Sequence, residues 1–195
     1  MIKKIYFLGY SKKKTRIINF LKKNFIVKTL HNKSLTPSSA KNADLIILFG
    51  YNKIIKKEIL KITKRPIINL HISFLPYNRG AHPNFWAFYD NTPTGVTIHL
   101  IDGGVDTGPI VKQRFVNFEK EDDTFAKTYA ALIENIEGLF LDFLPSLLTD
   151  DWTAKKQRGI GTHHYAKDLP SNFSGWDSII EQEIARLDKE GLKYE

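Results

Sequence analysis

The chain has 195 residues, no cysteine and a formal net charge of +8. This length suits one domain with a hydrophobic core, and the lack of cysteine excludes a disulfide framework and a thiolate metal site. With 42% apolar and 26% charged residues, the composition also excludes a disordered or fibrous protein. No apolar run approaches the roughly 18 residues of a membrane span. The short N-terminal apolar run lacks the cleavage site of a secretion signal, so we expect a cytoplasmic protein without membrane contact.

Lysine runs such as 12–14 and 22–23 carry much of the positive charge. A charge of this size attracts anions without selecting among them, and we interpret it as a solvated surface. An alternative of a different class is a non-catalytic nucleic-acid-binding module. The sequence contains neither an RNA- or DNA-binding motif nor interleaved aromatic and basic residues, so we expect no nucleic-acid partner.

In the first half of the chain, apolar runs alternate with segments of helical period, which is typical of a parallel sheet with crossover helices. Strands are expected at 3–9, 25–30, 43–50 and 67–70, the last leading to Asn69 and His71, with helices at 16–24 and 54–63 and a loop at 32–41. The predicted fold class is α/β: a Rossmann-like open twisted sheet, mostly parallel, with helices on both faces.

In the second half, one or two helical turns are expected at 83–90, before strict alternation at 95–101 that predicts a strand. The glycines in 102–108 permit a turn into a second strand at 109–118, so antiparallel strands follow residue 94. A long amphipathic helix is expected at 123–148, capped by Asp122 or Asp123, and a final helix at 176–190. We expect a domain over residues 1–150 and an arm and helix over 151–195 packed on it.

Three polar residues can share one site. Ligands gather at the carboxyl ends of strands in α/β sheets, where Asn69 and His71, two residues apart, face the same way. Asp106 lies in a glycine-flanked loop that can present a carboxylate. On spacing alone, a histidine after a strand is more often structural.

Without a Ser or Cys nucleophile beside them, these three residues suit acyl transfer to an amine through a tetrahedral intermediate. Asn69 and a protonated His71 can donate hydrogen bonds to the oxyanion. Asp106 can hold His71 charged, or take the proton of the amine through a water.

Three separated blocks resemble the folate-dependent formyltransferase family over roughly residues 40–120. They are Asn69-Leu-His-Ile-Ser-Phe-Leu-Pro-Tyr-Asn-Arg-Gly80, Thr94-Gly-Val-Thr-Ile-His-Leu-Ile-Asp102 and Asp106-Thr-Gly-Pro-Ile110. The family includes enzymes that formylate glycinamide ribonucleotide, methionyl-tRNA or amino sugars. The resemblance implies that residues 1–150 are the catalytic domain and that Asn69, His71 and Asp106 are the catalytic group.

The resemblance also implies 10-formyltetrahydrofolate as co-substrate. Its pterin pocket would be formed by Tyr51, Ile54, Ile55, Asp102, Gly103, Gly104 and Val105, with backbone groups of the glycine loop pairing with the pterin edge. One of the two isoleucines can instead be plain helix core.

The stretches 77–86 and 91–99 most resemble the nucleotide-sugar N-formyltransferases, which implies an acceptor amine on a nucleotide-linked amino-deoxy sugar. The residues expected to bind it are Gly9, Tyr10, Ser73, Tyr77, Arg79, Gly80, Asn84 and Trp86. Because adjacent aromatics on a short helix usually place one ring in the core, the last two contacts have a structural alternative.

The other acceptors of the family fit less well. Gly9-Tyr10-Ser11-Lys12 replaces the glycine- and serine-rich phosphate loop of phosphoribosylglycinamide formyltransferase. About 45 residues follow the long helix, so we expect this chain to lack the C-terminal domain with which methionyl-tRNA formyltransferase binds tRNA. A catalytically inactive folate sensor is disfavoured because all three chemical residues are present.

Metal and assembly are the last expectations. His163 and His164 are neighbours that cannot easily share one ion, so no metal is expected. Because family members often pair, we expect a homodimer, and residues 151–195 either cover the substrate or build the dimer.

Overall fold

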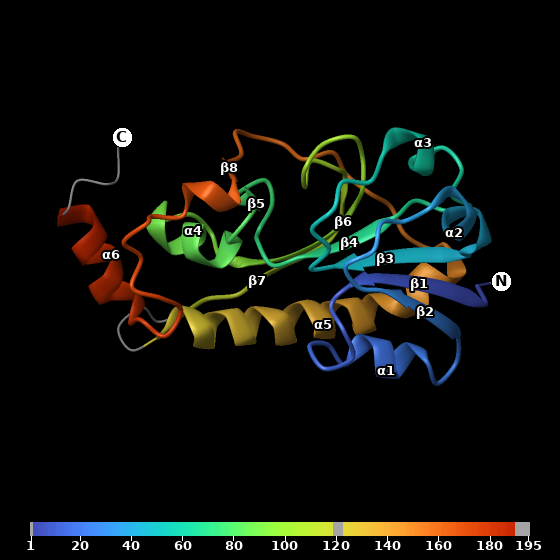
Figure 1. Ribbon diagram of the computed structural model, residues 1–195, viewed down its shortest axis with the longest axis horizontal. Coiled ribbons are helices and arrows are strands. Elements are labelled where there is room, and N and C mark those ends of the chain that lie inside the picture. The colour runs from blue at the N-terminus through green and yellow to red at the C-terminus, as the bar shows by residue number, and fades with distance from the viewer. Residues whose placement is uncertain (1, 119–122, 190–195) are drawn as a thin grey trace.

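A six-stranded sheet forms the centre of the molecule, in the order β2-β1-β3-β4-β6-β7 (Figure 1). The computed structural model of the protein describes residues 2–118 and 123–189. The strands are β1 (Lys4–Gly9), β2 (Ile26–Leu30), β3 (Leu45–Phe49), β4 (Ile68–His71), β6 (Gly95–Leu100) and β7 (Ile110–Phe115). The first four run parallel, whereas β6 and β7 are antiparallel to their neighbours. The predicted Rossmann-like, mostly parallel α/β sheet is thereby confirmed.

Helices cover both faces of the sheet (Figure 1). The helices of the described residues are α1 (Ile17–Leu21), α2 (Pro37–Asn42), α3 (Lys57–Leu60), α4 (Pro83–Tyr89), α5 (Phe125–Thr149) and α6 (Ile180–Lys189). Of these, α4 and α6 share a separate cluster, and α6 lies at the far end of the molecule from the sheet. Successive strand residues point to opposite faces, so Phe7 packs in the core beneath α1 and α5, while Leu8 packs in the core beneath α2 and α3. The inner strands β1 and β3 are therefore buried on both sides, as their continuous apolar runs require, whereas the edge strands β2 and β7 are partly exposed.

The prediction of a loop over residues 32–41 is wrong, because α2 occupies the second half of this segment. The Thr36 side chain accepts a hydrogen bond from the Ser39 N–H at 3.2 Å, and Pro37 occupies the first helical turn. Both features start a helix, since they satisfy or remove donors that a helix leaves unpaired at its N-terminus.

Three other helices are shorter than predicted. The helix expected at 16–24 is α1, with five residues, and the one expected at 54–63 is α3, with four. The final helix begins at Ile180 instead of residue 176. Helices this short show too few turns for hydrophobic periodicity to fix their ends.

The long helix α5 is close to its predicted bounds. Its cap is Thr124, whose side chain accepts from the Lys127 N–H at 3.2 Å, so the prediction of Asp123 is wrong. Asp122, the other predicted cap, lies outside the described residues. None of the helices in the described part of the chain combines the length and the apolar character that a membrane crossing needs.

Residues after α5 return to the body of the molecule at several places. Lys155 and Ile110 exchange two backbone hydrogen bonds of 2.8 Å. β8 (His163–His164) pairs in parallel with β5 (Arg79–Gly80), and the α6 residue Leu187 is buried in a cluster with residues of α4.

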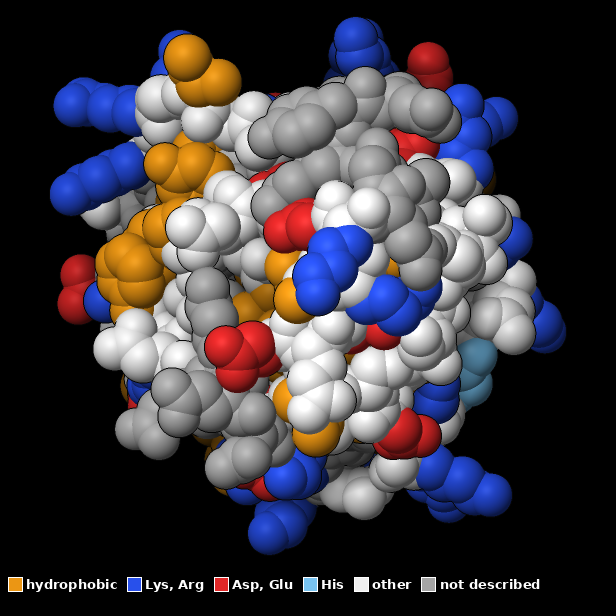
Figure 2. Space-filling model, turned by 90° about the vertical axis from the view of Figure 1, so that its left-hand side faces the viewer, with side chains coloured by type: hydrophobic (Ala, Val, Ile, Leu, Met, Phe, Trp, Pro, Cys, Tyr) orange, Lys and Arg blue, Asp and Glu red, His pale blue; other side chains and the backbone are white. Residues whose placement is uncertain are grey.

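At the α6 end of the molecule, Lys and Arg side chains project around the outline (Figure 2). The division into residues 1–150 and 151–195 stays a prediction.

Replacement of Phe140 by alanine tests the core beneath α5. Phe140 is fully buried there, so Phe140→Ala should lower the free energy of unfolding by about 3–5 kcal/mol through lost burial and the cavity left behind. Urea unfolding measures this loss. On the same helix Glu134 is exposed, and Glu134→Ala should change the value by no more than about 0.5 kcal/mol. Equal losses in both variants would contradict the placement of this core.

Candidate active site

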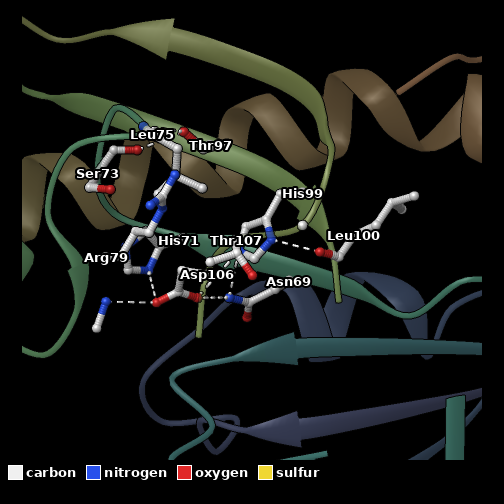
Figure 3. Close-up of polar contacts among 12 residues, drawn as sticks. Asn69, His71, Ser73, Leu75, Arg79, Thr97, His99, Leu100, Asp106 and Thr107 are labelled. Atoms are coloured by element: carbon white, nitrogen blue, oxygen red, sulfur yellow. Dashed lines mark hydrogen bonds and ion pairs between the residues drawn. The ribbon is translucent and has the colours of Figure 1, made fainter. Parts of the chain in front are cut away.

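Asp106 is the centre of a cluster of polar side chains at the carboxyl end of β4 (Figure 3). Its Oδ1 accepts a hydrogen bond from Asn69 Nδ2 at 3.1 Å, and its Oδ2 accepts one from the Gly80 N–H at 2.9 Å. His71 Nδ1 lies 3.7 Å from Oδ2, and His99 Nε2 lies 3.3 Å from Oδ1. The structure therefore brings the three predicted catalytic residues together, from one strand end and from a distant loop.

The loop between β6 and β7 delivers Asp106 through unusual backbone geometry. Asp106 has a φ of 52°, a left-handed conformation that Asp adopts more readily than most residues. Nearby, a Cβ on Gly108 would lie 1.8 Å from the Leu100 carbonyl oxygen, so only glycine fits. The close approach of these segments turns the loop back over the end of β4.

His71 is buried and held by its ring nitrogens. Its Nε2 lies 3.1 Å from the Asn78 carbonyl oxygen, which can only accept, so Nε2 carries a proton. Burial lowers the pKa of His71, and the nearby Asp106 charge only partly offsets this effect. Near neutral pH the ring is therefore uncharged, with a free Nδ1 lone pair, which differs from the expectation of a protonated His71.

Asp106 remains ionised although its side chain is only 12% exposed. Burial by itself raises the pKa of Asp106, but His71, His99 and the Gly80 N–H together outweigh that effect and hold the pKa well below its usual range. The carboxylate is thus a weak base and a fixed negative charge.

His99 is a member of the cluster that sequence reasoning missed. It lies directly opposite Asn69 in the β4–β6 ladder, and its Nε2 is 3.0 Å from Asn69 Nδ2. His99 Nδ1 donates to the Leu100 carbonyl at 2.8 Å, so in the neutral ring Nε2 accepts. Both N–H groups of Asn69 are then engaged, one by Asp106 and one by His99. The alternation of residues 95–101 places His99 on a strand face, but only the register between strands places it beside Asn69.

A pocket of about 720 Å³ opens beside the cluster. All three predicted catalytic residues line it, and so do all the predicted folate contacts: Tyr51, Ile54, Ile55, Asp102, Gly103, Gly104 and Val105. The predicted helix would have buried Ile54, but the chain around it is irregular and the side chain is 83% exposed. Ile55 is buried and also packs in the core beneath α2 and α3.

Only two of the predicted acceptor contacts, Tyr10 and Gly80, line this pocket. The structure does not bring the other six to it: Gly9, Ser73, Tyr77, Arg79, Asn84 and Trp86. The Ser73 hydroxyl donates to the Tyr77 carbonyl at 2.9 Å. Gly9 lies directly against the backbone of β3 and not against the pocket, since a Cβ there would be 2.0 Å from the Phe49 carbonyl oxygen.

Asn84 and Trp86 have the structural roles that the alternative reading gave them. Asn84 is buried, donates to the Phe125 carbonyl at 2.8 Å and accepts from Thr128 Oγ1 at 3.1 Å, which ties α4 to α5. Trp86 is buried against His164, with ring centroids 3.9 Å apart and planes 5° apart. Contact with an acceptor would require these packed groups to separate.

The rest of the pocket wall includes residues that were not predicted to bind a ligand. His82 precedes α4, Tyr129 projects from α5, and His163 and Tyr165 come from the segment after α5. Tyr10 and Tyr129 join across the pocket edge through hydroxyl groups 2.5 Å apart, and burial and this bond raise the pKa of Tyr10. Within the part of the chain that the structure describes, no group of three or more His, Asp or Glu residues is placed to hold a metal ion.

Comparison with curated proteins gives relatives with two kinds of acceptor in their names. Methionyl-tRNA formyltransferase of Thermodesulfovibrio yellowstonii is 46% identical over 101 residues, which are 51% of this chain and 30% of that protein. A dTDP-4-amino-4,6-dideoxyglucose formyltransferase of Mycobacterium bovis is 36% identical over 52% of this chain and 43% of its own length. The matched stretch thus spans less than half of these curated relatives.

Solved structures are similar over nearly the whole chain. The formyltransferase PseJ of Anoxybacillus kamchatkensis, in complex with UDP-4,6-dideoxy-4-formamido-L-AltNAc and tetrahydrofolate, is 38% identical with a TM-score of 0.84, covering 94% of this chain and 98% of that one. A 4-N formyltransferase of Francisella tularensis shares the fold, with a TM-score of 0.74 at 19% identity over 93% of this chain and 86% of that one. The sequence profile of the formyl transferase family matches residues 8–142. With its cluster of Asn, His and Asp in the matched region, the chain belongs to the formyl transferase family.

Proposed function

We propose that the protein transfers a formyl group from 10-formyltetrahydrofolate to the primary amine of a nucleotide-linked amino-deoxy sugar. The cluster of Asn69, His71 and Asp106 at a pocket supports the reaction. The acceptor class is carried by one observation, the 38% identity to a sugar-nucleotide formyltransferase over 94% of this chain.

The folate side of the pocket suits a flat ring with polar edges. Ile54 and Val105 leave apolar side chains exposed there, 83% and 45% respectively. The Asp102 carboxylate is held at the turn by the Gly104 N–H at 2.8 Å and Thr107 Oγ1 at 2.7 Å. An apolar wall beside a loop of backbone amides provides both stacking surface and hydrogen-bonding groups. The carrier would supply the carbonyl carbon that the acceptor amine attacks.

His71 is the residue best placed to move the proton of the amine. Its Nδ1 lone pair accepts that proton as the new nitrogen–carbon bond forms, and the resulting imidazolium lies 3.7 Å from the Asp106 carboxylate, which stabilises it. The same proton then passes to the nitrogen that leaves when the old carbon–nitrogen bond breaks. Asp106 itself serves as the fixed charge, because its hydrogen bonds make it a poor base.

Asn69 has two duties in this scheme. In the structure it holds Asp106 Oδ1, and rotation of its amide toward the pocket would present an N–H to the oxygen on which negative charge develops.

The loop after β1 argues against a ribonucleotide acceptor. At the start of α1, the Arg16 N–H donates to Glu137 Oε1 at 3.1 Å, and the Thr15 hydroxyl donates to the same oxygen at 2.5 Å. Glu137 is buried, so the anion position at the N-terminus of the first helix is occupied by the protein's own carboxylate. A terminal phosphate cannot bind there without displacing it.

A panel of acceptors tests the function directly. With 10-formyltetrahydrofolate, UDP- and dTDP-linked amino sugars should be formylated, as detected by mass spectrometry of the product. Methionyl-tRNA is the second candidate, favoured by the 46% identity over 101 residues, and glycinamide ribonucleotide is the third. Formylation of methionyl-tRNA alone would overturn the sugar acceptor, and no product with any acceptor would overturn the reaction. The homodimer, the cytoplasmic location and the absence of a nucleic-acid partner stay predictions.

Alanine substitutions test the assigned chemistry. His71→Ala and Asn69→Ala should each lower kcat by at least about a hundredfold, the scale of a lost general base or oxyanion donor, in steady-state assays. Asn135 is a matched control, because its amide bonds only to the α5 backbone, at the Ala131 carbonyl. Asn135→Ala should keep kcat within about twofold. Wild-type turnover in His71→Ala would refute its role as base.

The pH dependence of kcat tests the charge state of His71. A base must be unprotonated, so kcat should fall as pH decreases through the pKa of His71, which burial lowers from its ordinary value of 6.5. The acid limb of the wild-type profile is therefore expected below pH 6.5. In Asp106→Asn the charge that favours imidazolium is lost, so the limb should move to still lower pH. A wild-type limb above pH 6.5, or a limb that moves up in Asp106→Asn, contradicts this assignment.

A further inference from the structure

Gln157 joins the loop that carries Asp106 to the segment that carries Gly80. Its Nε2 donates to the Asp106 carbonyl at 2.7 Å and to the Gly108 carbonyl at 2.8 Å. Its Oε1 accepts from Arg79 Nε at 3.0 Å and from Arg79 Nη2 at 2.7 Å. Both amide hydrogens and both lone pairs are thus used, which fixes the orientation of the side chain.

The surrounding chain shows that Gln157 is turned inward for these contacts. The residues at 155, 156 and 158–160 are all exposed, whereas Gln157 is half-buried. Four residues after Gln157 the chain lies directly against the segment before β5, since a Cβ on Gly161 would be 2.3 Å from the Pro76 carbonyl oxygen. Residues 155–164, here called the arm, therefore cover the active-site loops closely.

The arm also binds residues 78–80, whose backbone contacts both His71 and Asp106. The Asn78 N–H donates to Thr162 Oγ1 at 2.7 Å, and the Arg79 N–H donates to the Thr162 carbonyl at 3.1 Å. Residues 78–80 in turn provide two backbone groups of the site. The Asn78 carbonyl accepts from His71 Nε2, and the Gly80 N–H donates to Asp106 Oδ2. Both the imidazole and the carboxylate are thus positioned by backbone that the arm holds.

We propose that Gln157 is a positioning residue. It sets the place of the Asp106 carboxylate relative to His71 by binding the carbonyls of Asp106 and Gly108 and, at its other end, the Arg79 side chain. The left-handed conformation of Asp106 persists only where neighbouring contacts hold it. A displacement of about 1 Å at a reacting group can cost on the order of a hundredfold in rate. Loss of Gln157 should therefore slow turnover without removing any group that touches a substrate.

Two Gln157 variants and one control separate positioning from general stability. Gln157→Met keeps the size of the side chain but removes its four hydrogen bonds, while Gln157→Glu keeps an acceptor for Arg79 and loses both donors. Gln113 is the matched control, a half-buried glutamine on β7 whose Nε2 donates to the Leu75 carbonyl at 2.7 Å and to Thr97 Oγ1 at 3.0 Å. Thermal unfolding confirms that each variant is folded.

The kinetic readout rests on the proposed function. In both Gln157 variants kcat should fall by about tenfold to a hundredfold, with KM for carrier and acceptor within about threefold, because the chemistry is impaired and binding is not. Gln113→Met should keep kcat within about twofold, even where it lowers the melting temperature equally. A kcat within twofold of wild type in both Gln157 variants overturns the proposal, as does an equal fall in Gln113→Met.

The second readout needs no enzyme activity. Asp106 Oδ2 accepts from the Gly80 N–H at 2.9 Å, so displacement of the carboxylate should raise the hydrogen-exchange rate of the Gly80 amide by about tenfold in NMR, the scale of one lost charge-assisted bond. Unchanged exchange in the Gln157 variants overturns the positioning role, whereas absence of formyl transfer by the wild type overturns only the proposed function. Unfolding of both Gln157 variants also overturns the role, because Gln157 would then hold the fold itself.

Discussion

Asp106 brings a negative charge into a place that is almost closed to water, and several separate segments supply what this charge requires. A buried carboxylate is tolerated only when its oxygens are paired with donors. Here the donors come from Asn69 at the end of β4 and from Gly80 in β5, and the His99 ring of β6 lies 3.3 Å from the same carboxylate. None of these segments can satisfy the carboxylate alone. The site therefore forms only when the sheet and the loop after β6 have come together.

The chemistry of the cluster follows from this arrangement. Because the carboxylate is held by hydrogen bonds, it stays charged and weakly basic, and the proton-accepting role falls to the buried, uncharged His71. The loops at the carboxyl ends of strands lack sheet pairing, so side-chain amides take over the bonding there. Asn69 and Gln157 each use both amide N–H groups for this purpose. The surrounding apolar cores give the sheet its stability, while these amides give the site its geometry.

Sequence reasoning reached the sheet, the long helix and the three central residues because each has a local signal. Apolar runs indicate the first four strands, alternation indicates the strand at 95–101, and a spacing of two residues indicates the common direction of Asn69 and His71. His99 and Gln157 have no such signal, since their partners lie 30 and 51 residues away and depend on strand register and on the path of the arm. Short helices such as α3 were misjudged because four residues show no period. Trp86 was assigned to the acceptor, although adjacent aromatics on α4 pack inward.

One part of the pocket wall comes from residues outside the stretch that matches the family profile, and this bears on acceptor choice. The folate side is formed by residues 49–55 and 101–106, which lie within the stretch 8–142 that matches the family profile. The rest of the wall includes His82 and Tyr129, which also lie in that stretch, and residues 163–166, which lie outside it. Residues in this wall can change without altering the Asp106 cluster, provided that the arm keeps its backbone contacts. Relatives that share only half of this chain can therefore share the chemistry and differ in the acceptor, whereas similarity over 94% of the chain extends to this wall as well.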